Sequence, residues 1–264
     1  MTYSSEQLAT RIRKSALEMT HRVSASHIGT CFSMADFLAV LYNEVMCIDP
    51  QKPNWKQRDR FILSKGHGAA IYYALLAELG FFSKSMLKGY CDNGSILTGH
   101  VNSEVPGVDV SAGSLGHGLS IGCGMSLSIK NKGSSSKVYA IVSDGELDEG
   151  SVWESILFAP HHNLNNLVLI IDYNKIQSFG RVEEIINLEP ISKKFESFNW
   201  DVVEIDGHDI KKIYKSLINK NLNKPKVIVA NTIKGKGIKL FENDNNWHHS
   251  IITKSIYKNI LKEL

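Results

Sequence analysis

Two polar positions follow neighbouring apolar runs of the sequence, where parallel sheets commonly bind ligands. Asp144 and Gly145 come directly after the run 137–143, and Asn174 follows the run 167–172, thirty residues beyond Asp144. Both runs are rich in valine, isoleucine and leucine, which is typical of buried parallel strands. Because ligands bind at the carboxyl ends of strands in open parallel sheets, we expect Asp144 and Asn174 to converge on one point.

The chemistry of these side chains suits a metal bound to phosphate. Carboxylate and carboxamide oxygens are hard ligands for Mg²⁺ or Ca²⁺, which often complete their shells with phosphate oxygens and water. Gly145 allows a close backbone approach, and the helix expected over 150–159 would offer free N–H groups to a phosphate; Pro160 is expected to kink or end it. A turn after one strand and a cap after the other would explain the same residues without a ligand.

The elements that must position these residues alternate along the chain. A loop over 94–118 is rich in glycine and serine, and loops of this length in compact domains are usually functional. We predict one α/β domain over 1–264, a doubly wound parallel sheet flanked by helices, with an N-terminal helical region. The expected helices cover 5–21, 34–45 with Ser33 as N-cap, 68–80, 119–131 and 209–220, and the further strands cover 60–64, 200–205 and 226–231.

Composition excludes several classes of protein. Hydrophobic residues make up 43% and charged residues 22% of the 264, so a packed core is expected. The longest apolar runs fall short of the roughly 20 residues of a membrane span, and charges interrupt the N-terminus where a signal peptide would be apolar. The four cysteines are scattered, with no C-x-x-C pair, and indicate free thiols in a reducing compartment. We therefore expect a cytoplasmic protein without a membrane partner.

Positive charge is concentrated near the end of the chain. Residues 211–264 hold 12 lysines and no arginine against three acidic residues. A solvated, lysine-rich surface explains this excess, and so does a surface that meets an acidic partner or an anionic substrate. Nucleic acid is not expected, because aromatic residues do not interleave with the basic ones there.

The spacing of the two strand ends resembles the thiamine diphosphate-binding motif. In that family an Asp, an Asn and a backbone carbonyl two residues after the Asn hold the metal of the diphosphate. The resemblance implies Asp144, Asn174 and Ile176 as ligands of Mg²⁺ or Ca²⁺, with thiamine diphosphate as cofactor. The family motif usually begins with Gly, where this chain has Ser143.

The histidine segments narrow the resemblance to one family. The stretches 24–29, 64–68, 97–118 and 245–250 resemble, in order, the four histidine segments of the N-terminal half of transketolase. The resemblance extends from about residue 8 to residue 250 of this chain. Several separate motifs in the same order indicate a common family.

The resemblance also implies roles for individual residues. His27 and His100 would lie over the thiazolium ring and bind the first hydroxyls of the sugar. His67 and His248 would contact the diphosphate or the substrate beside it. His249 stands where the family has Gly, so either His248 or His249 would be the functional histidine. The implied catalytic residues are His27, His100 and His248.

Further positions complete the implied cofactor site. Residues 113–115 would form a backbone shelf against the cofactor, and Glu149 would join a network between the active sites of paired chains. His161 and His162 match no motif and are interpreted as surface residues at a helix end. The implied cofactor-binding residues are His67, Gly113, Ser114, Leu115, Gly145, Glu146, Glu149, Asn174 and His248.

The resemblance implies the N-terminal subunit of a split transketolase, active only with a separate C-terminal subunit. That partner would supply the pyrimidine-binding domain, and the assembly would be a heterotetramer. The reaction would move a two-carbon ketol unit from a ketose phosphate to an aldose phosphate. Imidazole suits the proton transfers of such a reaction near neutral pH.

Two alternatives remain open from the sequence. One is a subunit of another thiamine diphosphate enzyme, such as the α chain of a 2-oxo acid dehydrogenase, although that family lacks the full histidine set. The other is a non-catalytic relative that binds the cofactor. The identities of the ketose donor and of the aldehyde acceptor are not predicted.

Overall fold

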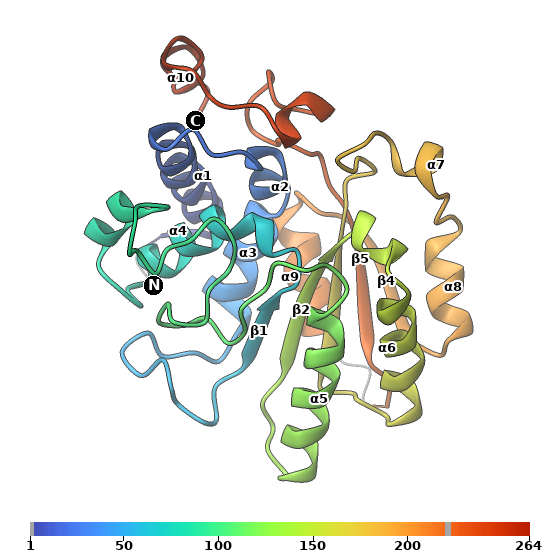
Figure 1. The fold of residues 1–264 in the computed structure, drawn as a ribbon. Helices are drawn as coiled ribbons and strands as arrows, with labels where there is room; N and C mark the ends of the chain where they lie inside the picture. The colour runs from blue at the N-terminus through green and yellow to red at the C-terminus, as the bar shows by residue number, and fades with distance from the viewer. Residues whose placement is uncertain (1–2, 220–222) are drawn as a thin grey trace.

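A five-stranded parallel sheet forms the centre of the computed structural model, which describes residues 3–219 and 223–264 (Figure 1). Every strand pairing is parallel, as the doubly wound prediction requires. Each strand begins and ends within one residue of the predicted range. In sheet order the strands are β1 (Arg60–Leu63), β2 (Val138–Ser143), β3 (Leu167–Tyr173), β5 (Lys226–Asn231) and β4 (Asp201–Asp206).

Helices cover both faces of the sheet because the central strands are apolar on both sides. Strand β3 is buried at every position, and its alternate residues join two separate hydrophobic clusters. The first cluster packs α1 (Ser5–Arg22), α3 (Ala35–Val40), α4 (Ala69–Leu79) and α9 (Ile210–Ile218) on one face. The second packs α5 (Gly118–Asn131), α6 (Gly150–His161) and α8 (Ile191–Ser197) on the other (Figure 1).

The helix expected to begin after Ser33 is built differently. Ser33 is the last residue of a separate short helix, α2 (Ile28–Ser33), and α3 is capped at Met34 without a side-chain hydrogen bond. After α3 the chain continues as a π-helical turn, Leu41–Val45. The prediction of Ser33 as an N-cap is therefore wrong, because its hydroxyl donates to the buried carboxylate of Asp172 over 2.5 Å.

Most other predicted elements are present. Gly80 ends α4 in the left-handed conformation, with φ of +88°, as expected for a C-terminal glycine. The predicted 94–118 loop is irregular and folds back on itself in one bridge between Val101 and Ala112. Lys220, the last residue of the predicted helix 209–220, lies outside the described residues. The short elements are Gly66–Gly68, Lys84–Gly89, Gly145–Asp148, α7 (Val182–Ile185), Asn245–His248 and α10 (Lys254–Ile260).

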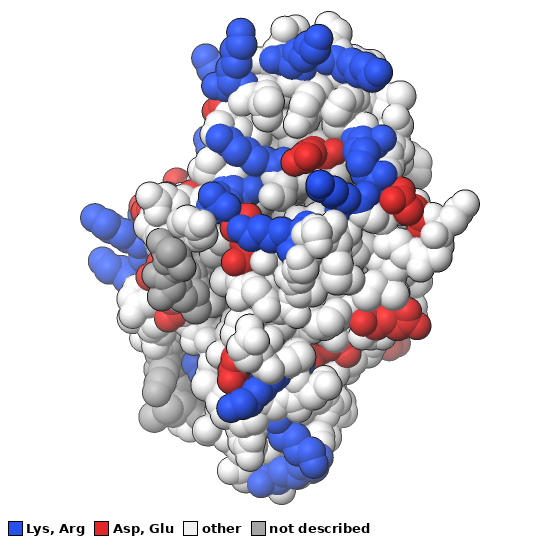
Figure 2. All heavy atoms as spheres, turned by 90° about the vertical axis from the view of Figure 1, so that its left-hand side faces the viewer, with Lys and Arg blue, Asp and Glu red and all other residues white. Residues whose placement is uncertain are grey.

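The surface agrees with the composition. All four cysteines are free, with Cys31 and Cys123 buried. Among the described residues, no helix combines the length and apolarity that a bilayer crossing requires. Basic side chains gather over the upper part of the face drawn in Figure 2, where α1 and α10 lie in Figure 1. This basic surface is compatible with both interpretations of the C-terminal charge.

Candidate active site

The carboxyl ends of β2 and β3 bring Asp144 and Asn174 together. The two strands are neighbours in parallel register, with Ser143 opposite Asp172. Asp144 is 1% exposed and Asn174 is 6% exposed, and both line a cavity of about 450 Å³. The predicted convergence of the two side chains at the carboxyl ends of two neighbouring strands is confirmed.

Backbone groups hold the Asp144 carboxylate in place. The N–H groups of Gly145 and Lys175 donate to its two oxygens over 2.8 and 2.6 Å. Burial, together with the nearby carboxylate of Asp172, raises the pKa of Asp144 to about 7. A buried carboxylate with this pKa favours a bound cation, which would offset the cost of burying its charge.

The other two predicted metal ligands adjoin Asp144. The Asn174 side-chain oxygen accepts from the N–H of Ile176 over 3.2 Å, and Ile176 lines the same cavity. A carboxylate, a carboxamide oxygen and a carbonyl oxygen form a donor set that suits Mg²⁺ or Ca²⁺. The residues present therefore fit the metal that the motif implies.

Lys234 enters this site from the segment after β5 and was not predicted. Its ammonium donates to the carbonyl oxygens of Ile176 and Gln177 over 2.9 and 3.3 Å, and lies 3.0 Å from Nδ1 of His248. Burial lowers the pKa of Lys234 to about 8. The only sequence signal for this residue is its place in a glycine-containing segment that follows a strand.

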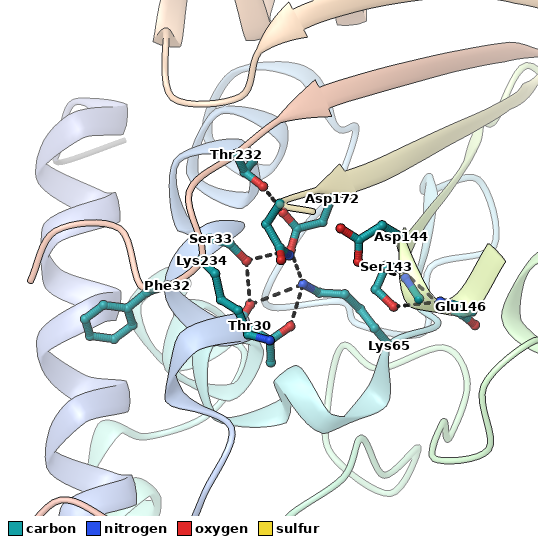
Figure 3. Close-up of polar contacts among 12 residues, drawn as sticks. Thr30, Phe32, Ser33, Lys65, Ser143, Asp144, Glu146, Asp172, Thr232 and Lys234 are labelled. Carbon is teal, nitrogen blue, oxygen red and sulfur yellow. Dashed lines mark hydrogen bonds and ion pairs between the residues drawn. The ribbon is translucent and has the colours of Figure 1, made fainter. Parts of the chain in front are cut away.

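A buried ion pair between Lys65 and Asp172, hydrogen-bonded to the cavity-lining residue Thr30, joins four segments of the chain (Figure 3). The ammonium of Lys65 donates to Asp172, and it also donates to Oγ1 of Thr30 over 2.8 Å. Ser33 and Thr232 donate their hydroxyls to the same Asp172 carboxylate. Burial alone would raise the pKa of Asp172, but the Lys65 ammonium and these hydrogen bonds lower it. The network fixes α2 and the ends of β1, β3 and β5 relative to one another.

Glu146 supports the site from behind. Ser64 donates its hydroxyl to the buried Glu146 carboxylate, and the N–H of Gly116 donates to the same oxygen over 2.8 Å. The N–H of Gly118 in turn donates to the Ser64 hydroxyl over 3.0 Å. Glu146 does not line the cavity, so the structure places it as an anchor of the 113–118 loop.

Four of the predicted histidines surround the same cavity. The ring of His27 lies 5.3, 6.1 and 5.2 Å from those of His67, His100 and His248, measured between centroids. The N–H of His27 also donates to the carbonyl of His248 over 3.1 Å, which ties the first histidine segment to the last. The first and last of these histidines, His27 and His248, are more than 200 positions apart in the sequence.

The environment keeps the imidazoles of His27, His67 and His248 neutral at pH 7, because it lowers the pKa of each ring. Burial, with the neighbouring rings of His100 and His249, lowers the pKa of His27 to about 4. Burial and the Lys234 ammonium lower the pKa of His248 to about 3, and burial holds that of His67 well below its usual range. Neutral imidazoles can each accept one proton or one hydrogen bond from a substrate hydroxyl.

His249 takes a different position from His248. It is exposed, and its ring centroid lies 4.6 Å from that of His248, outside the set that lines the cavity. Of the two, His248 is therefore the one that faces the cavity. A nitrogen of His249 lies within 4.8 Å of one on His27 and one on His248, but the Lys234 ammonium beside His248 opposes a metal there.

The remaining predicted residues are divided between the cavity and its rim. Gly113, Leu115, Gly145 and Glu149 line the cavity, whereas Ser114 does not. His161 lies exposed and His162 partly exposed at the C-terminal end of α6, away from the site. Other lining residues, which were not predicted, are Thr30, Asp148, Gln177, Ser178, Phe179, Ile185 and Lys234.

Comparison with known families shows to which protein family the chain belongs. The family model described as "Transketolase, thiamine diphosphate binding domain" matches residues 4–262. The chain belongs to this transketolase family. The resemblance inferred from the histidine and strand-end motifs is therefore confirmed, and a thiamine diphosphate-binding transketolase subunit is favoured over a 2-oxo acid dehydrogenase chain.

Similar curated proteins include transketolase subunits of comparable length. The apulose-4-phosphate transketolase subunit of Phocaeicola vulgatus is 37% identical, with 96% of this chain and 90% of that protein covered. The 6-deoxy-6-sulfo-D-fructose transketolase subunit SqwG of a Clostridium species is 38% identical, with 96% and 93% covered. Both match this transketolase chain along nearly their whole lengths.

Solved structures and longer relatives show the same fold in part of a larger chain. The transketolase of Campylobacter jejuni superposes with a TM-score of 0.93 at 30% identity, covering all of this chain and 43% of that one. Human transketolase is 36% identical, and the match covers 97% of this chain and 41% of the human protein. The α/β fold predicted from the alternating pattern is thus the transketolase cofactor-binding fold.

Proposed function

We propose that this chain is the cofactor-binding subunit of a split transketolase that moves a two-carbon ketol unit from a ketose phosphate to an aldose phosphate. The observation that carries the proposal is one cavity lined both by Asp144, Asn174 and Ile176, whose oxygens suit a hard metal ion, and by four histidines. A site that only bound the cofactor would have no need for additional imidazoles such as those of His27 and His100. The combination therefore favours catalysis over simple binding.

In this proposal Asp144, Asn174 and the Ile176 carbonyl would hold Mg²⁺ or Ca²⁺, which would supply positive charge for the diphosphate. Lys234 and the nearby histidines His67 and His248 add donors toward the phosphate oxygens. When bound, thiamine diphosphate supplies the stabilised carbanion that two-carbon transfer requires. The backbone at Gly113 and Leu115 provides an apolar wall beside it.

The protein's own contribution to the reaction is orientation and proton transfer. In this proposal His27 and His100, whose ring centroids lie 6.1 Å apart, would bind the sugar's first hydroxyls. The lowered pKa of His27, about 4, keeps its ring neutral, so that a ring nitrogen can accept a hydrogen bond from a hydroxyl. In this proposal the imidazoles of the cavity would take the hydroxyl's proton as the carbon–carbon bond breaks and return it when the acceptor aldehyde is attacked.

The partner is inferred from the relatives. Several are named as transketolase subunits, which implies a second chain, and the first two cover almost all of this chain. We infer a partner with a pyrimidine-binding domain, two copies of each chain, and the reducing cytoplasm that four free thiols fit. Two apolar residues that line the cavity, Phe179 and Ile185, are 89% and 37% exposed and support a docked partner there.

The decisive experiment is two-carbon transfer by this chain mixed with its C-terminal subunit, thiamine diphosphate and Mg²⁺. Donors to compare are a common ketose phosphate, apulose 4-phosphate and 6-deoxy-6-sulfofructose, because relatives are named for the last two. We expect transfer that needs both subunits and the metal. Full turnover by this chain alone, or activity toward pyruvate and none toward any ketose, would overturn the proposal.

A further inference from the structure

His208 lies at the turn after β4, outside the cavity, and both of its ring nitrogens are engaged. Nδ1 lies 2.8 Å from Oδ2 of Asp36, and Nε2 lies 2.8 Å from the backbone nitrogen of Ile233. A backbone N–H can only donate, so Nε2 must accept and carries no proton. Nδ1 then carries the proton and donates it to the Asp36 carboxylate. The two contacts together specify one neutral tautomer.

Asp36 is itself held rigidly. Arg13 donates two hydrogen bonds to its carboxylate, over 2.9 and 2.6 Å, and a third to the carbonyl of Phe32 over 3.1 Å. The side chains of Arg13, Asp36 and His208 are 7%, 13% and 11% exposed. A carboxylate that orients a histidine in this way fixes both the ring's tautomer and its direction. His208 is thus anchored from α1 and α3.

The segment that His208 contacts is held at successive residues. Thr232 donates its hydroxyl to Asp172, the N–H of Ile233 donates to His208, and the N–H of Gly235 donates to the carbonyl of Gly29 over 3.0 Å. Lys234 lies between the last two anchors. Its stem is enclosed closely, because a Cβ placed on Gly29 would come within 3.1 Å of Lys234 Cγ.

The position of this backbone decides where the Lys234 ammonium lies. That ammonium is 2.9 Å from the Ile176 carbonyl and 3.0 Å from His248 Nδ1. It therefore connects a proposed metal-ligand oxygen to one of the cavity histidines. A small displacement of Ile233 would move the Lys234 stem and lengthen both contacts. Donors in a binding site must be held within a fraction of an ångström by the groups behind them.

We propose that His208 is a positioning residue of the cofactor site, which fixes the Ile233 backbone so that Lys234 reaches Ile176 and His248. The inference rests on the proposed function, because it takes the Lys234 site to be the site of the diphosphate. His208 acts from outside the cavity through Nε2, which accepts from the Ile233 N–H, and Asp36 fixes the direction of the ring by accepting from Nδ1. This role predicts that cofactor affinity depends on a hydrogen-bond acceptor at the position of Nε2 and not on the imidazole ring as such.

The binding test uses three variants of this chain in the complex with its C-terminal subunit. His208→Phe removes the acceptor and keeps a ring, whereas His208→Gln places an amide oxygen near the position of Nε2. Asp209→Ala is the matched control, because the Asp209 carboxylate caps α9 through the N–H groups of Lys211 and Lys212 and pairs with the Lys212 ammonium at 3.7 Å. The measurements are the Kd for thiamine diphosphate with Mg²⁺, by calorimetry, and the Tm of each variant.

We expect His208→Phe to weaken cofactor binding about tenfold to a hundredfold, the range typical of groups that orient a site from behind. His208→Gln should recover most of that loss, and Asp209→Ala should lower the Tm with the Kd unchanged. Wild-type affinity in His208→Phe, or equal losses in the Phe and Gln variants, would overturn the inference. If the Phe variant does not fold, the inference is tested by the Kd of the Gln variant and by the tautomer of His208.

The tautomer can be read without any cofactor. In ¹⁵N NMR spectra of the wild-type chain, recorded well above the ordinary histidine pKa, His208 should show a protonated Nδ1 and an unprotonated Nε2. The opposite tautomer, or a mixture of both, would overturn the inference whatever the activity. Failure of the proposed function would look different, because the wild-type complex would then bind no thiamine diphosphate, or would bind it without moving a two-carbon unit, whatever the Kd of His208→Phe.

Discussion

The ammonium of Lys234 lies 2.9 Å from the carbonyl oxygen of Ile176, the backbone oxygen that the strand-end motif assigns to a metal. A carbonyl oxygen has two lone pairs, so it can accept from Lys234 and still face a cation on its other side. Lys234 is only 1% exposed, and its charge lies near the carboxylates of Asp144 and Asp172. The site therefore holds a second fixed positive charge beside the two carboxylates, in addition to the Lys65 ammonium that pairs with Asp172.

Lys234→Met should weaken the binding of the magnesium–diphosphate part of the cofactor. Methionine keeps the buried stem and removes the charge, so the fold should be retained while a donor toward the phosphate is lost. A hydrogen bond to a charged group contributes about 1.5–3 kcal/mol, so we expect roughly a tenfold to hundredfold rise in Kd. Calorimetry with magnesium pyrophosphate measures it. Lys175→Met, on an exposed neighbour, is the control and should bind normally.

Asp144→Asn should abolish metal-dependent cofactor binding without unfolding the protein. The amide has the same shape as the carboxylate but no charge, and it relieves the repulsion from Asp172. The amide nitrogen would face one of the two backbone N–H groups that donate to the carboxylate, which opposes this relief, so we expect only a small change in the free energy of unfolding, measured in urea without metal. Calorimetry with Mg²⁺ and thiamine diphosphate should show no binding. Wild-type cofactor affinity in this variant would remove Asp144 from the metal site.

The sequence predicted the parts of this site that depend on local pattern and on one adjacent pair of strands. Asp144 and Asn174 could be placed together because consecutive βαβ strands commonly lie side by side, and β2 and β3 do so. Lys234 could not be placed in this way. It follows β5, which pairs with β3 although β4 comes between them along the chain. Its contact with Ile176 depends on that non-sequential strand order.

Ser33 failed as a predicted N-cap for a related reason. Serine before an apolar helical run normally caps the helix, but the Asp172 carboxylate, 139 residues away in sequence, accepts the Ser33 hydroxyl instead. The same buried carboxylate holds Lys65 and Thr232. Here a long-range polar network, which the local sequence pattern does not reveal, outweighs the tendency of serine to cap a helix. Glu146 is a similar case, because its partners Ser64 and Gly116 lie far from it along the chain.

His100→Ala should impair catalysis while leaving cofactor affinity unchanged. The ring of His100 lines the cavity near Gly113, whereas its backbone carbonyl, which accepts from Tyr73 over 2.8 Å, would be kept by alanine. Loss of one hydrogen bond to a substrate hydroxyl is expected to reduce kcat/KM roughly tenfold to a hundredfold. Steady-state kinetics of the two-subunit enzyme would measure it. His117→Ala, an exposed histidine of the same loop, should have wild-type kinetics.

Asp36→Asn should destabilise the protein most near neutral pH. Burial alone would raise the pKa of Asp36, but hydrogen bonds from His208 and Arg13 outweigh it and lower the value from 3.8 to about 2. Because the folded-state pKa is below the unfolded one, the ionised carboxylate stabilises the fold above the unfolded pKa. This contribution, on the order of 2 kcal/mol, is lost as the pH falls from about 5 toward 2.

Urea unfolding of the wild-type and Asp36→Asn chains at a series of pH values measures this dependence. We expect the difference in free energy of unfolding to be largest near neutral pH and to shrink in acid, because protonated Asp36 and asparagine then carry the same charge. Asp49→Asn, at a partly exposed aspartate whose ion pair with Lys52 spans 3.7 Å, is the control. Its effect should be within about 0.5 kcal/mol at every pH, as for other surface substitutions. A pH-independent difference for Asp36→Asn would show that its charge does not stabilise the Arg13–Asp36–His208 network.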